Sequence, residues 1–250
     1  MRRLSAASLV AFIVLSGACE KAPPPPAQTP AVAAVQAAPA TPAPEVVAPI
    51  STAGLLHPDA KKVDAIGPDS FIVHVVTSKG PFDVKVHRNW APKGADHLYF
   101  LMQNGFYDGV RFYRVISGFM AQFGAAPDTA IAAIWGGKTI GVDPVKHSNS
   151  RGTLTYAMAG SPDTRSTQLF INTVDNARLD ESGFAPIGEI TSGMKVIDSL
   201  YNEYGEGAEG GGRGPLQGRI ASEGNAYLIR EFPKLDYIVS ARVVQEWKKP

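Results

Sequence analysis

The most informative segment of this 250-residue chain reads Phe112-Tyr113-Arg114-Val115-Ile116-Ser117-Gly118-Phe119-Met120-Ala121-Gln122. Its β-branched and aromatic residues predict two short strands joined by a turn at Ser117-Gly118. Arginine is seldom fully buried without a partner, so Arg114 is either in a surface ion pair or directed into a partly dry site. The segment by itself favours the ion pair.

A second segment favours the site instead. It reads Gln168-Leu169-Phe170-Ile171-Asn172, three apolar residues between two polar ones, and predicts another strand. In order and in residue type, the two segments resemble the core of the cyclophilin family of peptidyl-prolyl cis/trans isomerases. The resemblance covers about residues 68–247. With both segments present, we expect Arg114 to point into a site.

The resemblance implies a set of site residues. The arginine of the family motif maps onto Arg114, which would be the catalytic residue. The substrate-binding positions map onto Phe119, Met120, Gln122, Ala157, Met158, Ala159, Gln168, Phe170, Arg178, Leu179 and Phe184. Of these, the two glutamines would orient Arg114 and the peptide backbone. The apolar pocket for proline would be formed by Phe119, Met120, Phe170 and Leu179.

The chain departs from the family pattern at several of these positions. Met158 replaces an asparagine that is frequent between the two groove alanines, and Arg178 replaces a tryptophan that is associated with tight cyclosporin binding. Phe184 stands where the family has a pocket histidine, and residues 123–125 replace a Gly-Gly-Asp segment. Because Arg114 is kept, the departures bear on inhibitor sensitivity and peptide preference more than on the reaction.

Local patterns predict the elements of a folded domain over residues 68–250. We expect a hairpin of strands 71–77 and 81–87, and further strands near 110–116, 119–123, 153–159, 167–173, 184–190 and 236–247. Apolar periodicity and glycine stop signals predict helices at 92–103, 192–204 and 216–230. These elements predict a mainly β fold, a closed antiparallel eight-stranded barrel capped by helices, which the cyclophilin resemblance also implies.

The first 67 residues have a different composition. Two arginines and a short apolar run predict a signal peptide over residues 1–18. Small residues precede the only cysteine, Cys19, as in a bacterial lipoprotein box, so we expect its lipidation; ordinary cleavage after Ala18 is the alternative. Residues 19–67 hold half of the 20 prolines and predict a disordered tether. We expect export to the periplasm or cell envelope, with the lipid holding the protein on a membrane.

Other chemistries have little support in the sequence. A formal net charge of +1 predicts no strong field for nucleic acid. The five histidines and the single cysteine lack metal-ligand spacing, and we expect no cofactor. Residues 205–210, Gly-Glu-Gly-Ala-Glu-Gly, match the letters of a dinucleotide fingerprint. They follow a predicted helix instead of a strand, and their carboxylates would repel phosphate, so this motif is rejected.

The sequence therefore predicts a peptidyl-prolyl cis/trans isomerase that acts on proteins folding outside the cytoplasm. Its partners would be proline-containing unfolded or folding polypeptides, and we expect a monomer. Prolyl isomerisation needs no nucleophile, acid or metal. It needs a hold on the proline ring and a donor that meets the twisted amide. The alternative is a proline-peptide-binding chaperone or adaptor with little turnover, for which Met158 and Arg178 are the reasons.

Overall fold

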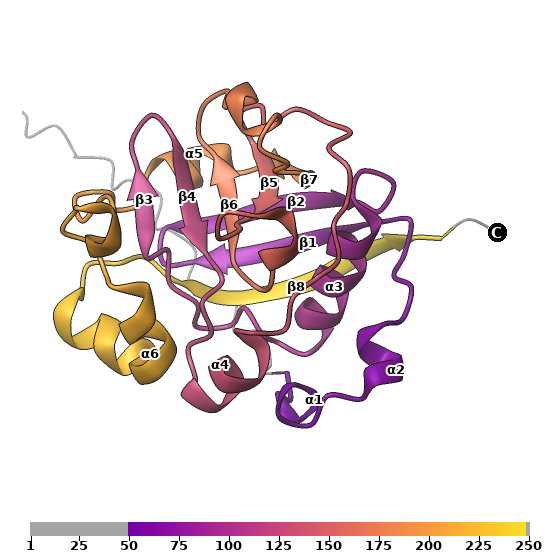
Figure 1. Ribbon diagram of the computed structural model, residues 1–250, viewed down its shortest axis with the longest axis horizontal. Coiled ribbons are helices and arrows are strands. Elements are labelled where there is room, and N and C mark those ends of the chain that lie inside the picture. Colours follow the sequence, from indigo (N-terminus) through magenta and orange to yellow (C-terminus); the bar gives the residue numbers. More distant parts are fainter. Residues whose placement is uncertain (1–49, 249–250) are drawn as a thin grey trace, which may run out of the picture. The chain divides into compact units, whose positions relative to one another are not determined.

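The computed structural model describes residues 50–248, in which eight antiparallel strands form one sheet (Figure 1). The strands are β1 (Ser70–Thr77), β2 (Gly80–His87), β3 (Arg114–Ile116), β4 (Met120–Phe123), β5 (Thr153–Tyr156), β6 (Leu169–Asn172), β7 (Pro186–Ser192) and β8 (Ile238–Trp247). Their order across the sheet is β3-β4-β6-β5-β7-β2-β1-β8. Each strand overlaps a predicted one, so the mainly β fold is confirmed.

The expected closure of the sheet into a complete barrel is not confirmed. β3 and β8 stand at the two ends of the strand order and do not pair with each other in a ladder. Instead, the segment before β3 contacts the start of β8. The amide of Gly109 donates to the carbonyl of Ile238 at 2.8 Å, and Arg111 and Tyr237 form an isolated bridge. Because residues 109–112 make these contacts, β3 begins only at Arg114.

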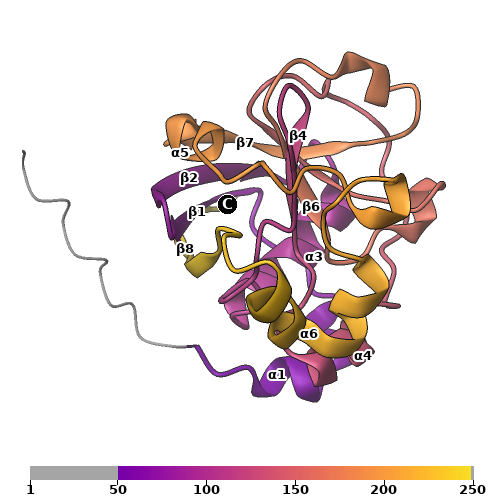
Figure 2. The ribbon, with the colours of Figure 1, turned by 90° about the vertical axis from the view of Figure 1, so that its left-hand side faces the viewer.

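Six α-helices accompany the sheet within residues 50–248. They are α1 (Ala53–Leu56), α2 (Ala60–Val63), α3 (Pro92–Gln103), α4 (Thr129–Trp135), α5 (Met194–Asp198) and α6 (Gln217–Glu231). α3 coincides with the predicted helix and packs against β2, β7 and β8. α6 also lies where the sequence predicts a helix, and it packs beside α4 (Figure 2). None of these helices is long and apolar enough to cross a membrane.

The helix expected over residues 192–204 is much shorter in the structure. Ser192 still belongs to β7, and Gly193 has a left-handed φ of 80°. Beyond α5, the amide of Tyr201 donates to the carboxylate of Asp236 at 2.7 Å instead of to a helical carbonyl. The carboxylate of Asp236, just before β8, therefore accepts the hydrogen bond that the Tyr201 amide would make to a main-chain carbonyl in a longer helix.

Residues 53–63, which the sequence assigns to the tether, form α1 and α2. Leu55 is completely buried, and its carbonyl accepts a hydrogen bond from the indole of Trp135 at 2.9 Å. The folded region thus begins upstream of the expected boundary at residue 68, because α1 covers α4 with an apolar residue. The predicted signal peptide, the lipidation site at Cys19 and residues 19–49 lie outside the described residues.

Two hydrophobic clusters support the sheet. The larger one fills the space between the strands and α3 and includes Phe71, Leu98 and Phe112, all completely buried. The smaller one packs α6 near β3 and consists of Tyr113, Ile220, Tyr227, Leu228 and Leu235. Since Tyr113 directly precedes Arg114, the smaller cluster fixes α6 close to the segment that carries the predicted site.

Candidate active site

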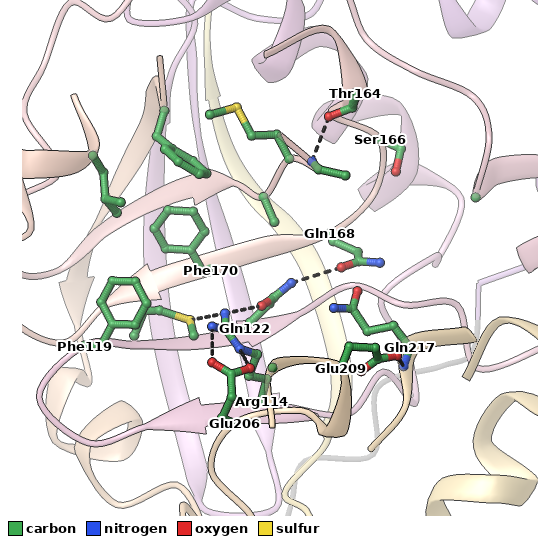
Figure 3. Close-up of a pocket in the computed structure, with 18 residues that line it drawn as sticks. Arg114, Phe119, Gln122, Thr164, Ser166, Gln168, Phe170, Glu206, Glu209 and Gln217 are labelled. Carbon is green, nitrogen blue, oxygen red and sulfur yellow. Dashed lines mark hydrogen bonds and ion pairs between the residues drawn. The ribbon is translucent and has the colours of Figure 1, made fainter. Parts of the chain in front are cut away.

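A pocket of about 460 Å³ collects side chains from β3, β4 and β6, from the segment after β5 and from the loop before α6 (Figure 3). Apart from Arg178, every predicted site residue lines it: Arg114, Phe119, Met120, Gln122, Ala157, Met158, Ala159, Gln168, Phe170, Leu179 and Phe184. The guanidinium of Arg178 lies 4.7 Å from the centre of the Phe119 ring, so this residue stands at the edge of the same pocket.

The hairpin of β3 and β4 determines where Arg114 and Gln122 lie. The two residues are opposite each other in the ladder, and the connecting turn includes Gly118 with a left-handed φ of 70°. Gln122 is also opposite Phe170 of β6, so these three side chains share one face of the sheet. The residues that alternate with them are buried in the core: Val115, Ala121 and Ile171.

A chain of hydrogen bonds holds the Arg114 guanidinium from the sheet side. Nη1 of Arg114 donates to Oε1 of Gln122 at 2.9 Å. The amide nitrogen of Gln122 donates to Oε1 of Gln168 at 3.0 Å, and the hydroxyl of Tyr113 donates to the same oxygen. Burial raises the pKa of Tyr113, so its hydroxyl stays protonated and remains a donor. The glutamines therefore orient the arginine, as the resemblance implies.

A carboxylate holds the other side of the guanidinium. Nε and Nη2 of Arg114 donate to the two oxygens of Glu206, at 2.5 and 2.6 Å. Hydrogen bonds from Arg114 lower the pKa of Glu206 below its ordinary value and outweigh the opposing effect of partial burial. Glu206 is therefore ionised at neutral pH, and the two side chains form a bidentate ion pair.

Glu206 is not predicted as part of the site from the sequence. It lies in the Gly-rich residues 205–210, which match only the letters of a nucleotide motif, and no local pattern connects it with Arg114. The other lining residues outside the predicted set are Gly136, Thr164, Ser166, Glu209, Gly210 and Gln217. Glu206, Glu209 and Gly210 belong to the loop that leads into α6, and Gln217 is the first residue of that helix.

The opposite part of the pocket is apolar. The rings of Phe170 and Phe184 meet edge to face, with their centres 5.7 Å apart. Phe119 and Leu179 also line this part. In Figure 3, Phe119 and Phe170 lie to one side of Gln122, and Glu209 lies to the other. The pocket thus presents an apolar wall for a ring next to a fixed cationic donor.

A buried ion pair, also absent from the sequence prediction, fixes one wall of the pocket. Nη2 of Arg165 lies 3.2 Å from Oδ2 of Asp143, and both side chains are 1% exposed. Asp143 also accepts hydrogen bonds from the first amides of α3, those of Lys93 and Gly94. Thr164 and Ser166, which flank Arg165, line the pocket. The pair therefore connects this wall of the pocket to the start of α3. Removing either Arg165 or Asp143 would leave the other as an unpaired buried charge.

This arrangement is suited to a reaction without a covalent step. A preorganised cationic donor in a partly dry site stabilises negative charge or a lone pair that develops beside it. An apolar wall next to the donor holds the neighbouring ring in place. Within residues 50–248, no three His, Cys, Asp or Glu side chains come together in a way that could hold a metal ion.

The chain matches one family of known proteins over most of this region. The family model described as Cyclophilin type peptidyl-prolyl cis-trans isomerase/CLD matches residues 72–221. A peptidyl-prolyl cis-trans isomerase of Acinetobacter baylyi is 33% identical over 145 residues, which cover 52% of this chain and 72% of the relative. Peptidyl-prolyl cis-trans isomerase B of Escherichia coli is 29% identical over 184 residues, covering 68% of this chain and 97% of the relative.

Solved structures show the same likeness in fold. The crystal structure of a cyclophilin type peptidyl-prolyl cis-trans isomerase from Cryptosporidium parvum superimposes with a TM-score of 0.53. The match covers 71% of this chain and 99% of that structure, at 18% sequence identity. At this identity the likeness shows a shared fold and no more.

Proposed function

The chain belongs to the family of cyclophilin-type peptidyl-prolyl cis-trans isomerases, and from this premise we propose that it isomerises prolyl bonds of proteins folding outside the cytoplasm, with Arg114 as the catalytic residue. One observation carries the proposed mechanism. The guanidinium of Arg114 is held at 2.9 Å by Gln122, next to an apolar wall that includes Phe170. A directional charge and a place for a proline ring thus occur in one pocket.

The proposed mechanism follows from the nature of the barrier. Amide resonance sets the uncatalysed barrier at roughly 18–20 kcal/mol. At the twisted transition state this resonance is lost, and the proline nitrogen gains a localised lone pair. The apolar wall holds the proline ring while the acyl part rotates, and Arg114 donates to the nitrogen or to the carbonyl oxygen. Only a contact that is stronger in the twisted state than in the planar states accelerates the reaction.

Turnover distinguishes an isomerase from the alternative function, a proline-peptide-binding chaperone or adaptor. The alternative is favoured by two departures from the family pattern, Met158, which lines the pocket, and Arg178, which lies against Phe119. A chymotrypsin-coupled assay on a short proline peptide tests the choice. We expect the rate of cis-to-trans conversion to rise in proportion to protein concentration. Calorimetric binding of the same peptide without such a rise would instead support the chaperone or adaptor.

We place the protein in the periplasm or cell envelope, anchored through a lipid on Cys19. The support is the signal-like start of the chain, the small residues before its sole cysteine and the Pro-rich residues that follow. A prolyl isomerase is useful there, since uncatalysed isomerisation takes tens of seconds or more and can limit folding. The partners are unfolded or folding polypeptides that contain proline, and no cofactor is required.

Cell fractionation tests the anchor. The substitution Cys19→Ser should move the protein from the membrane fraction to the soluble extracytoplasmic fraction, while its isomerase activity stays the same. If the substituted protein still sediments with membranes, another contact holds it there.

A further inference from the structure

The carboxylate of Glu206 occupies one whole edge of the Arg114 guanidinium. It accepts from Nε and from Nη2, while Gln122 accepts from Nη1 (Figure 3). An arginine side chain carries five N–H donors. Three of them are therefore committed to protein oxygens, and a fourth, on Nη1, faces the sulfur of Met120 at 3.9 Å. The fifth lies on Nη2, at the end of the side chain.

The loop around Glu206 is built to hold this residue in place. The amide of Gly207 donates to its carboxylate at 2.8 Å, and the amide of Gly214 donates to its main-chain carbonyl at 2.8 Å. Two further glycines touch it so closely that a side chain would not fit. A Cβ atom added to Gly212 would lie 2.1 Å from the carbonyl oxygen of Glu206, and one added to Gly210 would lie 2.8 Å from its side chain.

We infer that Glu206 is a positioning residue for the isomerase reaction, which fixes the guanidinium of Arg114 so that its end, with the remaining N–H of Nη2, faces the bound amide. This inference rests on the proposed role of Arg114 as the catalytic residue. The role of the Gly-rich segment before α6 is then to place the carboxylate of Glu206 against Arg114.

Two effects of Glu206 on catalysis oppose each other. The carboxylate reduces the net charge that Arg114 offers to the substrate, but it also removes the freedom of the guanidinium to rotate. The charge effect is weakened by solvent, since the side chains of Arg114 and Glu206 are 23% and 35% exposed. Misplacing a catalytic group by about 1 Å can cost on the order of 100-fold in rate. Orientation therefore outweighs charge, and removal of Glu206 should slow the reaction.

The near-isosteric substitution Glu206→Gln tests the inference in the full chain. It keeps the size of the side chain but removes the charge and one acceptor. We expect kcat for a proline peptide to fall by about 5- to 20-fold, while KM changes by less than about twofold, because the contact acts on the twisted state. The matched control is Glu203→Gln in the same loop region, an exposed residue that accepts from the hydroxyl of Tyr201 and should leave kcat unchanged.

A double-mutant cycle separates positioning from a general structural effect. In an Arg114→Lys background the bidentate pair cannot form, because an ammonium group lacks the planar fork of the guanidinium. Glu206→Gln should then change kcat by less than about twofold, so the two substitutions are not additive. Equal losses in both backgrounds would show that Glu206 acts through something other than Arg114 and would overturn the inference.

The remaining outcomes are equally decisive. A rise of kcat in Glu206→Gln would mean that the carboxylate hinders catalysis by Arg114. An unchanged kcat would mean that the carboxylate has no effect on the reaction. Either result overturns the inference. If kcat falls in Arg114→Ala but not in Glu206→Gln, only this inference fails. If Arg114→Ala retains full activity, the proposed mechanism fails as well. Thermal unfolding of each variant confirms that it is folded when its activity is measured.

Discussion

The side chain of Arg114 contacts an amide, a thioether and a carboxylate at once. The amide of Gln122 and the sulfur of Met120 belong to the same hairpin. Their positions could be predicted from sequence because a hairpin fixes which residues face each other. The carboxylate of Glu206 comes from 92 residues further along the chain. Its position depends on close glycine contacts and on the packing of α6, and no pattern of residue types reveals either.

Arg178 provides a prediction about inhibitor binding at the residue scale. Its guanidinium stacks on Phe119 at 4.7 Å and donates to Asn176 at 3.0 Å, at the edge of the proline pocket. The substitution Arg178→Trp should raise the affinity for cyclosporin by at least about tenfold, since a buried interface tryptophan often contributes about 2 kcal/mol. A hydrated arginine must instead lose water against an apolar macrocycle. Peptide turnover should change little.

Calorimetric titration with cyclosporin compares the natural protein, Arg178→Trp and a control, Arg230→Trp. Arg230 lies on the exposed side of α6, so its substitution adds the same ring away from the pocket. Tight binding by the natural protein, or no gain in Arg178→Trp, would show that Arg178 does not occupy the tryptophan position of the family pattern.

At the scale of elements, strands were more predictable than short helices. The hairpin of β1 and β2 follows from a β-branched run, a turn and a second run. α4 was not predicted, although Asp128 caps it by accepting from the amides of Ala130 and Ile131 at 2.8 and 3.1 Å. It spans less than two full turns, too few for helical periodicity to be recognised. α5 was predicted too long because a distant side chain, Asp236, accepts from the amide of Tyr201, three residues beyond the end of the helix.

The Gly-rich loop before α6 leads to a prediction about an element. In Gly212→Ala the new Cβ atom would lie 2.1 Å from the main-chain oxygen of Glu206, so the loop must shift. We expect kcat/KM to fall several-fold, about as far as in Glu206→Gln, although no charge is removed. Peptide turnover measures the fall in kcat/KM, and thermal unfolding shows whether the variant is still folded.

Gly218→Ala is the matched control for the loop. Gly218 lies in the first turn of α6, and an added Cβ atom would meet nothing within 4 Å. Activity should stay unchanged, and stability should rise by up to about 1 kcal/mol because alanine is the better helix former. If both alanine variants behave alike, the close packing around Glu206 is irrelevant to catalysis.

At the scale of the whole molecule, the folded region reaches further toward the N-terminus than composition indicates. Pro and Ala content predicted a tether up to residue 67, yet Leu55 and Val63 are buried. Composition averages over many residues and cannot detect two apolar side chains that have partners elsewhere in the fold. Closure of the sheet was not predictable either, because it depends on how two segments far apart in the sequence, the residues before β3 and the start of β8, contact each other.

Leu55 tests whether α1 is part of the folded region. The substitution Leu55→Ala should lower the free energy of unfolding by about 2–4 kcal/mol, because the side chain is completely buried. Isomerase activity should be retained, since Leu55 does not line the pocket. The neighbouring Leu56 is 38% exposed, so Leu56→Ala should cost about 0.5 kcal/mol or less. If urea unfolding shows that Leu55→Ala also costs about 0.5 kcal/mol or less, burial of Leu55 in α1 adds nothing to stability.

The central claim is that Arg114 catalyses prolyl isomerisation, and the most direct measurement is the activity of Arg114→Ala beside the natural protein. We expect kcat/KM to fall by at least about tenfold, a loss of about 1.4 kcal/mol or more of transition-state stabilisation. The fold should persist, because the side chain lies at the pocket and not in either hydrophobic cluster. A folded Arg114→Ala protein with unchanged turnover would contradict the account.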